Sequence, residues 1–482
     1  MTIINNVKWV SASQLVKVVC QLAGMVIFSR YLTPSEFGVM SMTLVVSNFV
    51  SIIRDMGFSA AIIQRERLSK CFLNTVFYFN VFIGIVLFTI VFSSSAMVSH
   101  FFKEPELKGT LKAIALAFPL NSITAIHLSL LERNSKFLTV AKCESISSIM
   151  SLSIASFFAY MGAGVYSLVI QTLLYSFLSA SGFWFSTKWK PQLFFSFKEL
   201  ISTSRFSFDL VSFNFINYFS RNSDQIIIGK SFGSTLLGQY SLAYRIMLFP
   251  LQNITYVLTR SLFPILSRMQ NDKIECNNIY INTVKSIVLI VTPLMFGLAS
   301  IGYEFVPLVF GAQWRDVASL LIWLAPTAVL QSQISTTGAV FMSQGRTSVL
   351  LWLTIFNAFL QIGAFIVGSL YDINTIVILY FAANLVMYFP NMLFAVSVLG
   401  GSFLSLLKSI SLPILFGILM FASLLYIKPY ILFFMNLNPN SITFLIIQIF
   451  LGFLIYTMLI LIFERDDLRR FRGSLRKRNN IL

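Results

Sequence analysis

Long apolar runs alternate with short polar segments along the whole chain. Fourteen of these runs reach the length of about 20 residues that a helix needs to cross a bilayer. The runs lie at residues 9–30, 37–63, 72–98, 111–131, 139–160, 165–187, 207–230, 237–262, 281–301, 317–341, 347–369, 374–398, 406–426 and 443–463. The pattern predicts an all-α integral membrane protein, a polytopic bundle of about 14 transmembrane helices. The fourth and fifth runs, which are diluted by polar residues, and the thirteenth are the least well defined, so the expected number extends down to 12.

Composition excludes several soluble classes of protein. Of the 482 residues, 57% are hydrophobic and 11% are charged, whereas a soluble domain carries about 25% charged residues. Polar surface is therefore too scarce to cover a water-soluble globule of this size. A soluble enzyme, a disordered chain and a secreted disulfide scaffold are excluded on this ground.

The few charges are mostly positive, with 35 Lys and Arg against 18 Asp and Glu and a formal net charge of +17. Lys and Arg concentrate in cytoplasmic loops. With fourteen spans, most of these cations fall on one side if both termini are cytoplasmic, so we expect that orientation. The basic tail 465–480 then meets anionic lipid, and no nucleic-acid partner is expected.

An internal repeat relates two parts of the chain. Residues 26–41 align with residues 226–241 without a gap, at a shift of 200 residues. The matched positions include a basic residue, a glycine and a serine, namely Arg30 with Lys230, Gly38 with Gly238, and Ser41 with Ser241.

The repeat predicts two six-helix lobes at residues 1–190 and 191–400. Residues 401–482 then hold an appended helix pair and the basic cytoplasmic tail. Six-helix repeats keep their orientation in the membrane, so the lobes would be related by an axis along the membrane normal. Transporters built in this way bind substrate near the midplane and alternate access by rocking their halves.

Ionisable residues inside the predicted spans are the candidate substrate site. Such a residue costs about 2.5–3.5 kcal/mol at bilayer depth and usually faces a cavity. The four cations are Lys17, Arg54, Arg221 and Arg245, the two acids are Asp55 and Asp224, and the polar residues near them are Gln21, Asn48, Asn214, Asn217 and Gln225. The excess of cations favours an anionic substrate, and Arg side chains match phosphate oxygens. The alternative is structural, with pairs such as Arg221 and Asp224 neutralising each other.

No cofactor or metal is expected from the sequence. Only His100 and His127 are available as imidazole ligands, and neither belongs to a metal-binding motif. The GKS at 229–231 resembles the end of a phosphate-binding loop, but Asp224 stands where the first glycine of that loop should be. Energy would come from an H⁺ or Na⁺ gradient, from the membrane potential, or from the substrate gradient.

Several segments together carry a resemblance to a known family. They are SRYLTPSEFGVMSM (29–42), RDMGFSAAIIQ (54–64), the block from Asn217 to Pro250, LFPILSRMQ (262–270), FGAQWRDVASLLIWLAP (310–326) and GAVFMSQGRTSV (338–349). In these segments the chain resembles the Wzx-type polysaccharide flippases of the multidrug/oligosaccharidyl-lipid/polysaccharide exporter superfamily, close to the colanic-acid exporters. The resemblance covers nearly the whole chain.

This resemblance implies a fold, a function and a compartment. The fold would be two lobes in a V around a cationic cavity, plus a C-terminal helix pair that forms a groove for a polyprenyl tail. The protein would flip undecaprenyl-diphosphate-linked repeat units across the bacterial inner membrane for O-antigen, capsule or exopolysaccharide synthesis. A polymerase and chain-length proteins of the same pathway would be its partners. The diphosphate would be held by Lys17, Arg54, Arg221 and Arg245, and the candidates for ion coupling would be Asp55 and Asp224.

Three other functions compete with this interpretation. A cation-coupled multidrug exporter of the same superfamily should have an acid-rich cavity, whereas the charges here are mostly basic. A membrane polysaccharide polymerase generally needs a large outer loop, but the longest outer segments, about 99–110, 302–316 and 427–442, are short. A channel or a purely structural role is the third alternative, and the sequence shows no pore-like repeat in its favour.

Overall fold

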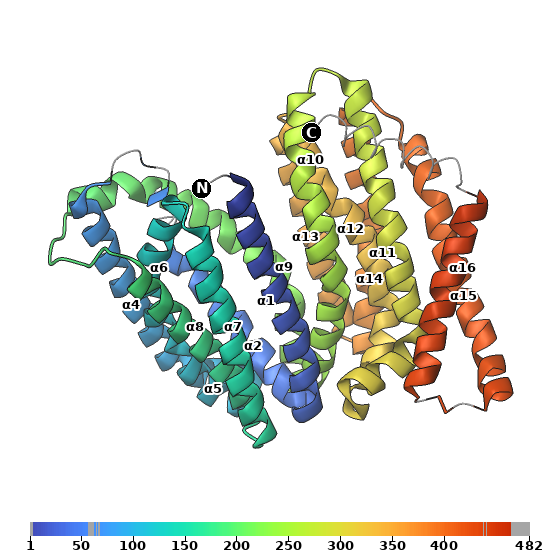
Figure 1. Ribbon diagram of the computed structural model, residues 1–482, viewed down its shortest axis with the longest axis horizontal. Coiled ribbons are helices and arrows are strands. Elements are labelled where there is room, and N and C mark those ends of the chain that lie inside the picture. The colour runs from blue at the N-terminus through green and yellow to red at the C-terminus, as the bar shows by residue number, and fades with distance from the viewer. Residues whose placement is uncertain are drawn as a thin grey trace. The chain divides into compact units, whose positions relative to one another are not determined.

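The computed structural model is built from helices, turns and loops in every part that it describes (Figure 1). The described residues are 3–55, 62–63, 65, 68–436, 438–439 and 441–463. The description does not extend to the side chains of residues 3–7, 53, 55, 198–217, 220, 254 and 256–257. Two compact units divide the chain, Met1–Ser241 and Leu242–Leu482, and their boundary lies inside one long helix. The predicted lobe boundary at residue 190 stays a prediction.

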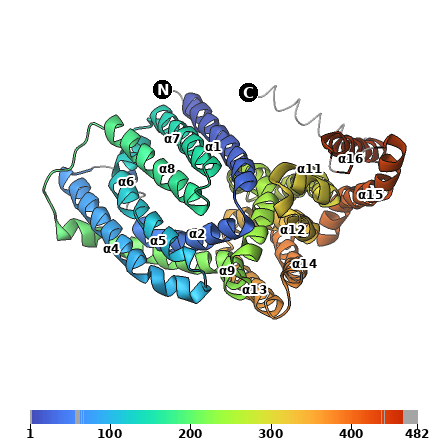
Figure 2. The same ribbon diagram turned by 90° about the horizontal axis from the view of Figure 1, so that it is seen from below.

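Among its described residues, the first unit contains seven complete helices and the beginning of an eighth. They are α1 (Ile3–Tyr31), α2 (Pro34–Asp55), α4 (Lys70–Phe102), α5 (Glu106–Ala115), α6 (Ala117–Arg133), α7 (Phe137–Tyr160), α8 (Val165–Ser186) and the start of α9 (Phe197–Pro250). α7 packs between α1 and α8, as Figure 2 shows, while α4 packs on α5 and α6 and α2 packs on α5. The site discussed below lies on α1, α2, α7 and α9.

A proline divides one predicted span into two helices. The run expected at 111–131 forms the end of α5 and most of α6, with a break at Leu116. Pro119 has no N–H to donate to the carbonyl of Ala115, and its ring crowds that carbonyl, which is the usual reason for a helix to break one turn before a proline.

The helix α9 differs from the two separate spans predicted at 207–230 and 237–262. Helical structure runs from Phe197 to Pro250 and is interrupted only at Gly233, whose φ of 80° and ψ of −175° suit a residue without a side chain. After Pro250 a π-helical turn, Leu251–Thr255, leads into α10 (Tyr256–Arg268). Pro250 and the π-helical turn after it thus interrupt the predicted span 237–262. Prolines and π-turns are common causes of such irregularity in helices.

In the part of it that the structure describes, the second unit contains the end of α9, α10 and six longer helices. These are α11 (Lys273–Phe310), α12 (Val317–Ser343), α13 (Thr347–Gly368), α14 (Ile373–Val398), α15 (Phe403–Met435) and α16 (Ile442–Phe463). α12 packs on α11 and α14, and α13 packs on α14. The appended pair, α15 and α16, packs against α11.

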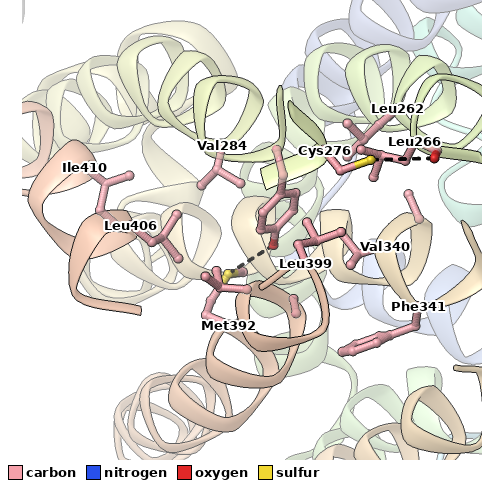
Figure 3. Packing of buried hydrophobic residues seen from close by; sticks show 14 of the residues in the cluster. Leu262, Leu266, Cys276, Val284, Val340, Phe341, Met392, Leu399, Leu406 and Ile410 are labelled. Atoms are coloured by element: carbon pink, nitrogen blue, oxygen red, sulfur yellow. Dashed lines mark hydrogen bonds between the residues drawn. The ribbon is translucent and has the colours of Figure 1, made fainter. Parts of the chain in front are cut away.

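The core of the second unit joins α10, α11, α12, α14 and α15, as Figure 3 shows. Buried aliphatic side chains such as Val284, Val340 and Leu406 fill it. The Tyr280 hydroxyl donates to the sulfur of Met392 at 3.5 Å. The Cys276 thiol donates to the carbonyl of Met269 at 3.1 Å.

Among the described residues, 12 helices are long and apolar enough to cross a membrane. They match the predicted runs except for 207–230 and 237–262. These two fall on α9, η1 and α10, where many side chains are outside the description. The prediction of an all-α, many-span membrane protein is confirmed.

Candidate functional site

Lys17 forms an ion pair with an acid that the sequence did not single out. Its Nζ on α1 lies 2.6 Å from Oε2 of Glu144 on α7, and the two side chains are 32% and 20% exposed. Both groups lie within helices that are long and apolar enough to span the membrane. A charge within a membrane-spanning helix is normally paired, so Lys17 is anchored to α7, while about a third of its side chain stays exposed.

The surface of α1 around Lys17 is polar on one side. Gln14 and Gln21 are exposed one turn to either side of Lys17, and residues three and four apart share a helix face. Leu15 and Val19, two residues to either side of Lys17 and therefore on the opposite side of the helix, are 66% and 64% exposed. The Gln14, Lys17 and Gln21 stripe suits water, and the apolar surface suits lipid or another helix.

Arg221 and Asp224, close together on α9, have different environments. Arg221 is exposed, whereas Asp224 is 2% exposed and accepts a 2.9 Å hydrogen bond from the hydroxyl of Tyr240. The backbone N–H of the half-buried Gln225 also donates to Asp224, at 2.8 Å. Because Tyr240 follows the break at Gly233, Asp224 joins the two halves of α9, and its role as a coupling acid stays a prediction.

The candidate residues of α2 lie near a contact with α9. The hydroxyl of Tyr218 donates to the carbonyl of Val45 at 2.6 Å, and the rings of Phe49 and Phe219 lie 5.0 Å apart. Asn48 is exposed beside this contact, and Arg54, one residue before α2 ends, is half-buried.

The structure says less about the contacts of the other predicted site residues. Arg245 is half-buried on α9 in the second unit. The side chains of Asp55, Asn214 and Asn217 lie outside the described residues. All substrate-binding and ion-coupling assignments therefore remain predictions.

The internal repeat appears in the first unit as a reciprocal contact between α2 and α9. A Cβ added at Gly38 would lie 1.8 Å from the carbonyl oxygen of Ser234, and one added at Gly238 would lie 1.8 Å from the carbonyl oxygen of Pro34. The hydroxyls of Ser35 and Ser234 are hydrogen-bonded at 2.8 Å. Gly38 thus packs where α9 resumes after Gly233, and Gly238 packs on the start of α2. The two contacts are related by the 200-residue shift.

The ends of these two helices are capped by acids of the first unit. Glu36 accepts a hydrogen bond from the backbone N–H of Thr33 at 2.7 Å, at the start of α2. Glu104 accepts one from the backbone N–H of Ser234 at 2.9 Å, where α9 resumes after Gly233. Negative side chains stabilise helix N-termini, so both helices begin at fixed points that place the glycines in contact.

In the second unit, polar side chains pair across helices. Asn357 and Asn391 exchange hydrogen bonds between α13 and α14, at 3.0 and 3.4 Å. The amide of Gln331 on α12 donates to Asn384 on α14 at 3.1 Å. These pairs join helices where water is scarce.

A second ion pair connects the appended helices to α11. Lys428 of α15 pairs with Glu304 of α11, a residue that is 5% exposed. Like Glu144, Glu304 was missed from the sequence, because each is a single acid in or near an apolar run and its partner is far away in the chain. Within the described ranges, no three His, Cys, Asp or Glu residues are grouped so that they could hold a metal ion.

Solved structures define the class of fold. The chain is similar to the lipid II flippase MurJ in its inward closed conformation, with a TM-score of 0.76 and 17% identity over 95% of this chain and 99% of that one. It is also similar to an inward-facing multidrug resistance MATE family transporter of the MOP superfamily, with a TM-score of 0.61 and 16% identity over 80% and 95%. The fold is therefore that of MOP-superfamily transporters, as expected from the sequence.

The family follows from the sequence comparisons. Residues 27–319 match the family described as "Polysaccharide biosynthesis protein", and the chain belongs to it. The succinoglycan biosynthesis transport protein ExoT of Rhizobium meliloti (strain 1021) is 27% identical over 99% of this chain and 96% of its own length. The teichuronic acid biosynthesis protein TuaB of Bacillus subtilis (strain 168) is 27% identical over 72% of each chain, and the lipopolysaccharide biosynthesis protein WzxC of Escherichia coli (strain K12) is 25% identical over 76% and 75%. The Wzx-type resemblance is confirmed.

Proposed function

We propose that this protein translocates lipid-linked oligosaccharide repeat units across the membrane for polysaccharide biosynthesis. The observation that carries the proposal is its match over 99% of its length to a protein named for succinoglycan biosynthesis transport. The flippase fold agrees with that activity, because lipid-linked sugars must cross a bilayer before they are assembled outside.

The cations of the membrane helices suit the substrate of this reaction. A lipid-linked repeat unit carries a diphosphate, and charged N–H donors form the stronger hydrogen bonds to phosphate oxygens. The exposed Arg221 and the partly exposed Lys17 are placed on helices of one compact unit. Arg54 and Arg245 complete the proposed set.

The compartment and the energy source belong to the same proposal. The protein would lie in the bacterial inner membrane with both termini in the cytoplasm, in keeping with the distribution of Lys and Arg. It would act as a secondary transporter, driven by an H⁺ or Na⁺ gradient or by the membrane potential, and not by hydrolysis of ATP. A polymerase and chain-length proteins would take the translocated units.

The test is a strain in which the gene is deleted and then restored with variants. Deletion should abolish surface polysaccharide and accumulate lipid-linked units that face the cytoplasm. Arg221→Ala, at equal protein level in the membrane, should lower export about tenfold or more, since a hydrogen bond to a charged group contributes about 1.5–3 kcal/mol. The control is Arg260→Ala, which removes an exposed cation of α10.

The outcomes separate the function from the assignment of the site. Normal surface polysaccharide in the deletion strain would contradict the proposed function. Full export by Arg221→Ala would leave the function in place and remove Arg221 from the substrate site. Export of cationic drugs, with no accumulation of lipid-linked units after deletion, would favour the multidrug exporter instead.

A further inference from the structure

We propose that the ion pair of Lys17 and Glu144 couples proton uptake to the binding of the anionic substrate. In this proposal the diphosphate binds Lys17 in place of Glu144, and Glu144 takes up a proton from water at the same time. The inference rests on the proposed function for the identity of the anion. The acids predicted from the sequence for ion coupling are Asp55 and Asp224. This proposal assigns the coupling to Glu144, because Glu144 contacts a cation that we propose to bind substrate.

The geometry leaves Lys17 able to change partners. An ammonium group has three N–H donors, and Glu144 is the acceptor at 2.6 Å. About a third of the Lys17 side chain is exposed, on the side of α1 that carries Gln14 and Gln21. A phosphate oxygen that arrives on this polar face can therefore reach the ammonium group without unpacking α1 from α7.

A second carboxylate makes the pair sensitive to charge. α7 packs against α1, α6 and α8. Glu132 of α6 and the hydroxyl of Tyr175 on α8 each interact electrostatically with Glu144. When both acids are ionised, the charge of Glu132 adds to that of Glu144, and together they oppose the approach of a diphosphate to the ion pair.

Arg133 and Lys142 are the cations nearest in the sequence to these two acids. The guanidinium group of Arg133 donates to the carbonyls of Ile62 and Ile63, at 2.6 and 3.2 Å, and to that of Arg65 at 2.5 Å. Lys142 is on α7 itself, on an exposed side, while Glu144 is half-buried. Lys17 is therefore the cation that Glu144 contacts.

Protonation removes the obstacle to anion binding. A proton from the aqueous phase binds a carboxylate oxygen of Glu144, the hydrogen bond from Lys17 to that oxygen is released, and Lys17 donates to a phosphate oxygen instead. No other bond forms or breaks. Since binding free energies are reciprocal, an anion at Lys17 favours proton uptake to the same extent that the proton favours the anion.

The experiment measures anion binding by the full-length protein in detergent as a function of pH. The probe is a synthetic sugar-diphosphoryl-prenol with a short prenyl chain. Both of its phosphates are esterified, so its charge lacks the second phosphate ionisation near neutral pH. Between about pH 5 and about pH 8, uptake of one proton per anion lowers the affinity of the wild type by up to about tenfold for each pH unit.

Glu144→Gln keeps the size of the side chain and removes the titration. We expect this variant to bind the probe at pH 8 at least as tightly as the wild type does at its acidic limit, with little change over the pH range. The matched control is Glu304→Gln, which neutralises the other Lys–Glu pair and should keep the wild-type pH profile. A monodisperse elution profile and an unfolding midpoint would verify that each variant is folded.

The results decide the matter in either direction. A wild-type pH slope that Glu144→Gln abolishes and Lys17→Gln replaces by weak binding supports the coupling. The same slope in Glu144→Gln and wild type overturns it while leaving the proposed flippase function intact. No binding of the probe to either protein overturns both this coupling and the proposed role of Lys17.

Discussion

The reciprocal glycine contact between α2 and α9 gives the sharpest structural prediction. Gly38→Ala places a methyl carbon 1.8 Å from the carbonyl oxygen of Ser234, and Gly238→Ala does the same at Pro34. Because real Cβ atoms stay beyond 3.0 Å of such atoms, the two helices must separate by roughly 1 Å or more. Both carbonyls belong to the backbone, at the start of α2 and where α9 resumes after Gly233, so no side-chain rotation relieves the clash.

The cost of this separation can be put on a scale. Overpacking of a well-packed site typically costs about 1–3 kcal/mol. If the α2–α9 contact forms and breaks during transport, that cost lowers the population of the closed contact by about 5-fold to 150-fold. Each alanine should therefore reduce transport and loosen the contact, and the two variants should resemble each other because the contact is reciprocal.

The assay is disulfide cross-linking across the contact. Ser35→Cys and Ser234→Cys replace hydroxyls that lie 2.8 Å apart, in a background whose four natural cysteines are changed to Ser. We expect rapid cross-linking in this parent and slow cross-linking after Gly38→Ala or Gly238→Ala. Gly363→Ala is the control, because nothing lies within 4 Å of a Cβ added there. Equal cross-linking in the parent and in both glycine variants would refute the reasoning.

Two further predictions concern stability. Tyr240→Phe removes the hydrogen bond to the buried Asp224, and leaving that acceptor without its donor should cost about 1–3 kcal/mol of folding free energy. The unfolding midpoint in detergent should therefore fall. The control Tyr371→Phe, at an exposed tyrosine, should leave the midpoint unchanged. At the start of α14, outside the spans, the hydroxyl and backbone N–H of Thr375 hold the pKa of the Asp372 carboxyl below its ordinary value. A lowered pKa means stabilisation that is present above about pH 4 and lost as the pH falls through the folded-state value. The difference in midpoint between wild type and Asp372→Ala should therefore be largest near neutrality and narrow in acid, and a difference that grows in acid would contradict this.

The prediction of spans from the sequence succeeded because hydrophobic length is a local property. A run such as 165–187 must be long and apolar to cross a bilayer, and α8 occupies nearly the same residues. Local sequence was less informative where proline acts one turn away. Proline accompanies both irregularities, the division of 111–131 into α5 and α6 and the π-helical turn after Pro250. A proline ring crowds the carbonyl of the preceding helical turn, and a hydropathy pattern does not contain this effect.

The candidate site shows the same limit more clearly. Lys17 was identified from the sequence as a cation within a predicted span, and it lies on α1, but its contact with Glu144 was not predicted. Asp224 was identified as a possible partner of Arg221, whereas its described hydrogen bonds come from Tyr240 and Gln225. Helix periodicity says which residues share a face, and only packing says which other helix that face meets.

By itself, the sequence determined the helical class, the positions of most spans, the duplicated segment and which cations fall within predicted spans. Tertiary structure decided that Gly38 and Gly238 pack on each other's helix starts, and that Lys17 is held by Glu144. The reason is physical. Insertion in a bilayer is governed by composition over about 20 residues, while a partner for a charge or a glycine is chosen by helices that approach each other from distant parts of the chain.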